Sequence, residues 1–102
     1  MSRGQEDSSW TFLTNHAQVL LAIAQNPDVR MRDLAEHVGI TERAAQRIVV
    51  DLVEAGYVKR LRVGRRNNYT INPRVEMRHS AQEGHPVGEL LDVLEPRDLA
   101  QP

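Results

Sequence analysis

The chain contains no cysteine, and this absence excludes disulfide frameworks and thiolate chemistry together. No apolar run approaches the roughly 20 residues that a membrane-spanning helix needs. The first nine residues are polar and acidic, which is not the pattern of a signal peptide. We therefore expect a cytoplasmic protein with no membrane partner.

The sequence also lacks the residue patterns of an enzyme or a metalloprotein. It has no Gly-rich phosphate loop and no His/carboxylate pair beside a convincing nucleophile. His79 and His85, with Glu83 and Glu89 nearby, could be considered as a metal site. The glycine and the proline that flank His85 interrupt the helix that would bring these ligands together. We expect no catalytic residue, no metal and no cofactor.

The net charge of −1 conceals a strong segregation of charge along the chain. Residues 41–78 hold nine Lys or Arg against four acids, so +5, whereas residues 1–40 carry −2 and residues 79–102 carry −4. Six of the basic residues, and no acid, lie in 57–74. A local basic face of this kind is the electrostatic signature of nucleic-acid binding.

Helical spacing of apolar residues is clear in the first half of the chain. It predicts helices over 14–25, 31–38 and 42–55. Thr41 is the expected N-cap of the third helix, and Gly39 supplies the left-handed residue that ends the second. With 102 residues and 40% apolar content, the chain is long enough for one modest core.

Alternation of polar and apolar residues after Gly56 is typical of a two-stranded hairpin. The turn is expected at 64–67, where glycine and asparagine occur. Four apolar residues are expected to face the helices: Leu61, Val63, Tyr69 and Ile71.

The predicted elements organise the chain around one folded unit. The fold class is mainly α with a small β-hairpin (α+β). We expect a disordered tail over 1–9, a DNA-binding domain over 10–72, a linker over 73–86, an amphipathic helix over 87–95 and a second tail over 96–102.

The order helix, helix, turn, helix, hairpin resembles the winged helix-turn-helix of bacterial transcription regulators, nearest the MarR and ArsR types. The residues that carry the resemblance are DLAEHVGIT at 33–41, Arg47-Ile48-Val49 with Leu52, and Gly56-Tyr57-Val58, and the match covers about 12–72. It implies a sequence-specific regulator that binds duplex DNA as a homodimer, on palindromic operators. The chain is shorter than a typical MarR protein and lacks the Cys and paired Asp/His pattern of metal-sensing ArsR proteins.

The third helix, about 41–55, is the expected recognition helix in the major groove. Arg43, Gln46 and Arg47 would read base edges, and Ala44 would offer a methyl contact to thymine. The alternative is that the two arginines only solvate an exposed helix face.

The basic hairpin, about 59–69, would hold the flanking backbone or enter a minor groove. The alternative is that its charges keep an edge strand soluble. Including the helix ends, the further DNA contacts expected are Arg32, Thr41, Lys59, Arg60, Arg62, Arg65, Arg66 and Asn67. Arg30, Arg74 and Arg78 are weaker candidates for phosphate contacts.

Two apolar stretches, one near each end of the chain, are expected to form the dimer contact. Their residues are Trp10, Phe12, Leu90, Leu91 and Leu94. The alternative is that both stretches pack within one chain. Two other functions stay open: a protein-interaction module whose basic face binds an acidic partner, and a regulator with a small-molecule effector, although no residue pattern indicates a ligand pocket.

Overall fold

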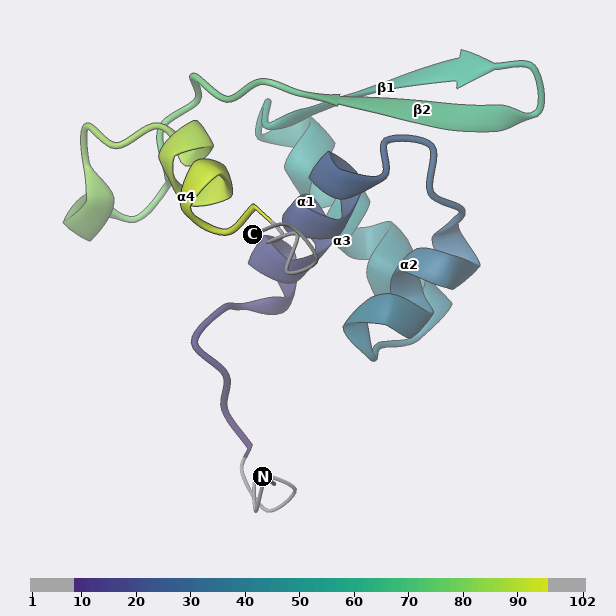
Figure 1. Cartoon of the computed structure of the whole chain (residues 1–102), viewed down its shortest axis with the longest axis horizontal. Helices are drawn as coiled ribbons and strands as arrows, with labels where there is room; N and C mark the ends of the chain where they lie inside the picture. The colour runs from purple at the N-terminus through teal and green to yellow at the C-terminus, as the bar shows by residue number, and fades with distance from the viewer. Residues whose placement is uncertain (1–8, 96–102) are drawn as a thin grey trace, which may run out of the picture.

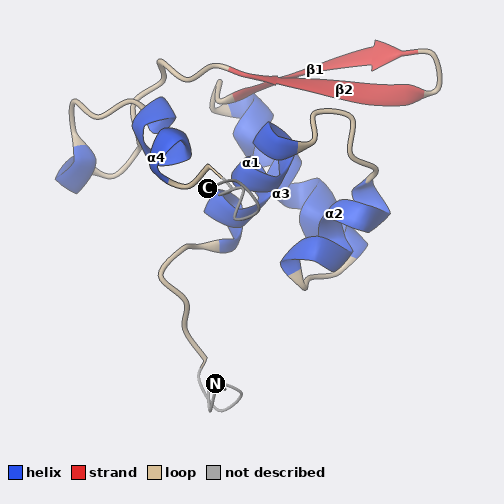
Figure 2. Ribbon diagram, viewed as in Figure 1, coloured by secondary structure: helices blue, strands red, loops and turns tan. Residues whose placement is uncertain are grey.

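The computed structural model describes residues 9–95, in which a helical bundle lies beneath a two-stranded hairpin (Figure 1; Figure 2). The predicted fold class is confirmed, because the three helices and the hairpin all form. The tails were expected over 1–9 and 96–102, and all of these residues except Ser9 lie outside the described part. No helix within 9–95 combines the length and the hydropathy needed to cross a membrane. The elements in order are α1 (Asn15–Gln25), α2 (Met31–Val38), α3 (Glu42–Glu54), β1 (Val58–Val63), β2 (Arg66–Ile71), the 3-10 helix η2 (Ser80–Gln82) and α4 (Val87–Val93).

Local capping explains where the helices begin and turn. The Thr14 hydroxyl accepts a hydrogen bond from the Ala17 N–H (3.1 Å) at the start of α1. At the junction of α2 and α3, Gly39 has a φ of 87°, which a residue with a Cβ rarely adopts. Its N–H donates to the Ala35 carbonyl at 2.8 Å and closes α2. The glycine therefore ends α2 and lets the chain turn into α3.

A single core joins the helices to the hairpin. The largest fully buried side chains are Val19 and Ile23 from α1, Leu34 from α2 and Val49 from α3. Residues of the hairpin, of α4 and of the link before β1 complete the core, namely Tyr57, Val58, Tyr69 and Val87. Because α3 and the hairpin share this core, their relative orientation is held by packing.

The hairpin register corrects one prediction about which side of β1 is buried. Val58 pairs with Ile71 and Arg60 pairs with Tyr69, and directly opposed residues project from the same face of an antiparallel pair. Val58, Tyr69 and Ile71 therefore lie toward the helices, as expected for the two β2 residues.

Leu61 and Val63 lie on the opposite face, where 48% and 63% of their surface is exposed. The prediction that they face the helices was wrong. Buried Val58 begins β1, and because side chains alternate along a strand, it places the odd-numbered positions outward.

The turn of the hairpin is shorter than predicted. It consists of Gly64 and Arg65 alone, with Gly64 at a φ of 64° and Arg65 at a negative φ. A positive φ at only the first central residue is the type II′ pattern, which matches the twist of the flanking strands. Arg66 and Asn67, expected in the turn, belong to β2.

The segment between β2 and α4 folds back against the bundle. Glu76 and Pro86 form an isolated β-bridge, and the Val87 N–H donates to the Val75 carbonyl at 2.8 Å. The Tyr57 hydroxyl donates to the Glu76 carbonyl at 2.6 Å. These bonds hold the start of α4 beside the core.

Candidate nucleic-acid interface

The outward face of α3 presents polar side chains that can reach the edges of bases. Arg43 and Arg47 are one helical turn apart on the same side, and Gln46 lies beside them. All three are exposed, whereas Ala44 is half-buried. The opposite side of the helix is fixed in the core by Ala45, Ile48, Val49 and Leu52.

The N-terminus of α3 is capped by its own sequence. The Thr41 hydroxyl accepts a hydrogen bond from the Ala44 N–H at 3.0 Å. That oxygen can still donate its proton to a phosphate, and a helix N-terminus attracts anions. Glu42 in the first turn already supplies negative charge there, which weakens this attraction.

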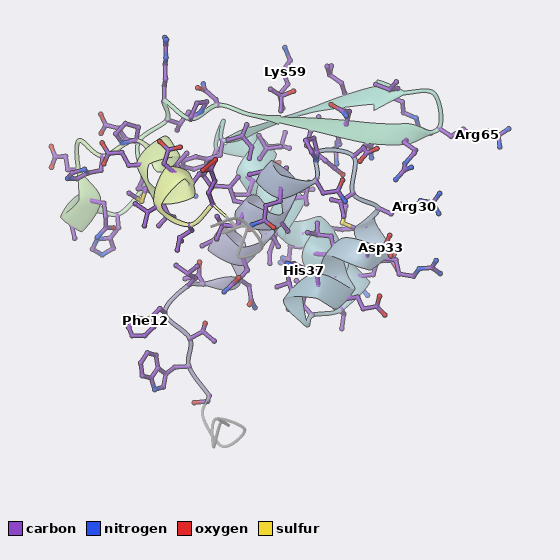
Figure 3. All side chains as sticks on the ribbon, viewed as in Figure 1. Phe12, Arg30, Asp33, His37, Lys59 and Arg65 are labelled. Atoms are coloured by element: carbon purple, nitrogen blue, oxygen red, sulfur yellow. The ribbon has the colours of Figure 1, made fainter. Side chains whose placement is uncertain are left out.

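The hairpin, which we call the wing (residues 58–71), carries basic side chains on both faces. Lys59 lies on the outer face, whereas the register places Arg60 and Arg62 on the face toward the helices. Figure 3 shows Lys59 pointing away from the helices and Arg65 projecting from the end of the turn. All four are exposed, so the wing offers positive charge in several directions.

Two hydrogen bonds fasten the wing to the loop that precedes α2. The Arg66 guanidinium donates from Nη2 to the Asp28 carbonyl at 2.9 Å. The Tyr69 N–H donates to the Pro27 carbonyl at 2.8 Å. Arg66 thus positions the wing, a role that the sequence could not indicate because its partner lies 38 residues away. Asn67, next to it, is half-buried.

Arg30 and Arg32 lie at the start of α2, and both are exposed. Arg30 occupies the N-cap position without capping the helix through its side chain. In Figure 3, Arg30 and Arg65 extend outward at the same end of the molecule.

The lysine and arginine side chains of the described residues are free of carboxylate partners. Within residues 9–95 there are two ion pairs, His16–Asp51 (2.8 Å) and His85–Glu89 (2.7 Å). Neither contains a lysine or an arginine, and in the same part of the chain no group of three or more metal-binding side chains forms. Apart from Arg66, which donates to the Asp28 carbonyl, the cations of α3 and the wing can therefore bind phosphate without first breaking an internal bond within residues 9–95.

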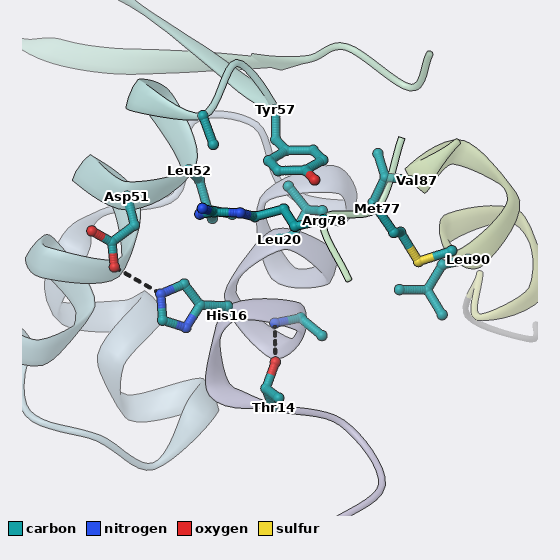
Figure 4. Close-up of a pocket in the computed structure, with 12 residues that line it drawn as sticks. Thr14, His16, Leu20, Asp51, Leu52, Tyr57, Met77, Arg78, Val87 and Leu90 are labelled. Atoms are coloured by element: carbon teal, nitrogen blue, oxygen red, sulfur yellow. Dashed lines mark hydrogen bonds and ion pairs between the residues drawn. The ribbon is translucent and has the colours of Figure 1, made fainter. Parts of the chain in front are cut away.

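A pocket that the sequence did not indicate opens between α1, α3 and the segment leading into α4 (Figure 4). Its volume is about 380 Å³. His16 and Asp51 form their hydrogen bond at one side, and Arg78 contributes a cation. The apolar part of the lining includes Leu20, Leu52, Tyr57, Met77 and Leu90.

The residues expected to make a dimer differ in exposure. Trp10 is 67% exposed and Phe12 is 92% exposed, on a segment that runs away from the bundle. Their rings contact each other edge to face, with centroids 5.1 Å apart. Leu90, Leu91 and Leu94 are half-buried on α4.

Three packed helices followed by a basic hairpin define a winged helix-turn-helix protein. The MarR family model matches residues 11–66, more than half of the sequence, and the chain belongs to the MarR family. No curated protein matches the chain.

Three solved structures share the fold. A Mycobacterium tuberculosis MarR family protein, RV2887, in complex with salicylic acid, is 30% identical with a TM-score of 0.51 over 61% of this chain and 49% of its own. The PcaV transcriptional regulator from Streptomyces coelicolor, in complex with its natural ligand, is 24% identical with a TM-score of 0.52, over 63% of this chain and 48% of its own. RV1404 from Mycobacterium tuberculosis is 23% identical with a TM-score of 0.52, over 70% of this chain and 49% of its own. The chain thus spans about half the length of these proteins.

Proposed function

We propose that this protein is a cytoplasmic transcription regulator that binds duplex DNA sequence-specifically as a homodimer. The observation that carries the proposal is the set of exposed basic side chains on α3 and the wing, none of them paired with a carboxylate within residues 9–95. Membership of the MarR family supports it, since the family consists of transcription regulators.

In the proposed complex, α3 lies in the major groove and the wing contacts the flanking backbone or minor groove. Arg43 and Arg47 suit guanine edges or phosphates, and Gln46 suits adenine. If each subunit neutralises about four phosphates, a dimer neutralises about eight, and log K falls with log salt at a slope of about −7. Two-fold symmetry places the half-sites about 34 Å apart.

Arg65→Ala is expected to weaken binding on every duplex and to flatten the salt slope by about two in a dimer, because one phosphate contact is lost per subunit. The side chain projects from the turn and can be removed without loss of an internal bond that the structure records. The slope is measured by fluorescence anisotropy at several salt concentrations.

Arg65→Lys is the matched control, since it keeps the charge and should keep the slope. An unchanged slope for Arg65→Ala would contradict a phosphate contact at the wing turn.

A second candidate function is a protein-interaction module that binds an acidic partner. The observation that favours it is the exposed pair Leu61 and Val63 beside Lys59 on the outer face of the wing. Apolar side chains gain little from phosphates, whereas a protein partner can bury them. A polyglutamate peptide that displaces the chain from duplex DNA at equal charge concentration would support this function, and failure to compete would exclude it.

We also propose that a small aromatic carboxylate acts as an effector in the pocket of Figure 4. The apolar lining suits an aromatic ring, and Arg78 suits a carboxylate. Salicylic acid, which RV2887 binds in its solved structure, is the first compound to test. Release of a labelled duplex on its addition is the expected result, and unchanged anisotropy at millimolar salicylate would exclude this ligand.

A further inference from the structure

Two of the four aromatic side chains lie in solvent at the N-terminal side of α1. We call residues 9–13 the arm; it contains Trp10 and Phe12, whose rings contact mainly each other. Large aromatics are the side chains that gain most from leaving water, and they dominate the energetics of interfaces. Their exposure side by side indicates a surface that is covered in the assembled protein.

The arm begins at the edge of the apolar pocket but is directed away from it. Thr14, which follows the arm, caps α1 and also lines the pocket. The Thr11 hydroxyl donates to the Leu13 carbonyl at 2.5 Å, which fixes a bend between the rings and the helix. Figure 3 shows Phe12 on the segment that leaves the body of the molecule. In this conformation the rings are presented to a neighbour rather than to their own chain.

We propose that the arm of one copy inserts Trp10 and Phe12 into the apolar pocket of a second copy, and that the exchange is reciprocal. This inference rests on the proposed homodimer and names the site that holds it together. A two-fold axis relates the two arms and the two pockets, so both contacts form at once.

The area that such an exchange buries is that of a stable dimer. Aromatic side chains bury about 150–250 Å² each. Two per arm, on two arms and with the matching pocket surface, bury at most about 1,200–2,000 Å², because Trp10 is 67% exposed in the single chain, and this reaches the range of specific protein interfaces.

The lining of the pocket suits aromatic rings. Leu20, Leu52 and Leu90 supply apolar surface, and the thioether of Met77 makes favourable contacts with ring edges. Arg78 offers a cation to a ring face. A small molecule in the same pocket would exclude the arm, so the two occupants compete.

Trp10 is the only tryptophan, and its fluorescence emission reports directly on the arm. In the full chain, the emission is expected to be blue-shifted at high protein concentration and to move to the red on dilution, in step with the fall from dimer to monomer mass in light scattering. A blue-shifted emission in a sample that is monomeric by mass would place the arm in its own pocket and overturn the proposal. So would a red emission in a sample that is dimeric by mass.

Two variants separate the arm from other contacts. Phe12→Ala removes a side chain that is 92% exposed in the single chain, so folding is unaffected and the dimer dissociation constant rises at least tenfold. Ala17→Phe fills the pocket from α1 and is expected to weaken the dimer to a comparable degree. Ala81→Phe adds the same ring at an exposed position outside the pocket and should leave the dimer dissociation constant unchanged. A dimer that neither Phe12→Ala nor Ala17→Phe weakens would overturn the arm exchange.

DNA binding by these variants is measured separately from their dimerisation. Monomeric variants keep α3 and the wing, so they should bind duplex weakly with about half the wild-type salt slope. If the arm and pocket variants dimerise like the wild-type protein while DNA binding persists, this inference alone is overturned. If the dimeric wild-type protein does not bind DNA, the proposed function is overturned instead.

Discussion

Arg47→Ala is expected to weaken binding to a selected duplex by about 1–3 kcal/mol, roughly 5-fold to more than 100-fold, and to relax the preference at one base pair. Arg47 lies on the exposed face of α3, one turn from Arg43, and has no carboxylate partner within residues 9–95. A bidentate contact with a guanine edge depends on its planar guanidinium, which alanine removes. The measurement is a competition titration against duplexes that differ at single positions.

The control for this prediction is Arg32→Ala, an exposed arginine at the start of α2 that we propose as a phosphate contact. It should weaken binding to all duplexes equally and reduce the salt slope. If Arg47→Ala behaves in the same way, then Arg47 binds the backbone rather than a base. If it has no effect on any duplex, the proposed recognition face of α3 is wrong.

Leu34→Ala is expected to lower the free energy of unfolding by about 2–5 kcal/mol. Leu34 is fully buried on α2, in the same core as Ile23 of α1 and Val49 of α3, so its removal leaves a cavity where the helices meet. Since small domains have only about 5–15 kcal/mol in total, this loss is a large share of the stability. Urea denaturation measures it as a shift of the midpoint at constant slope.

Val93→Ala makes a matched control, because Val93 is 80% exposed at the end of α4 and its truncation should change stability by less than about 0.5 kcal/mol. A loss for Leu34→Ala as small as that of Val93→Ala would contradict the packing described for α2.

Helix positions could be predicted because their signals are local. The Thr41 cap and the left-handed Gly39 are each decided by a few neighbouring residues, and the structure confirms both. The apolar stripe of α3 predicted which side would be buried, and so also which side would present Arg43 and Arg47.

The wing shows which structural features local sequence signals do not determine. Leu61 and Val63 alternate correctly with polar residues, but alternation alone does not say which set faces the helices. That choice depends on Val58, which the core buries before the exposed part of the strand begins. A turn two residues shorter than expected moved Arg66 and Asn67 onto β2.

Contacts between distant segments could not be predicted at all. Arg66 reaches the Asp28 carbonyl, and the pocket brings His16, Asp51 and Arg78 together from three separate segments. Neither arrangement leaves a pattern in the sequence, since each depends on how the elements pack. The roles of the individual DNA-contact residues stay predictions.

Binding of duplex DNA is tested most directly by titrating the protein into a labelled random-sequence duplex pool and measuring fluorescence anisotropy at several salt concentrations. The account predicts micromolar binding that weakens steeply with salt, with a slope of about −7 for a dimer. It also predicts that a preferred sequence can be selected from the pool. No binding at about 50 mM salt, where phosphate contacts are strong, would contradict the claim that α3 and the wing form a DNA-binding surface.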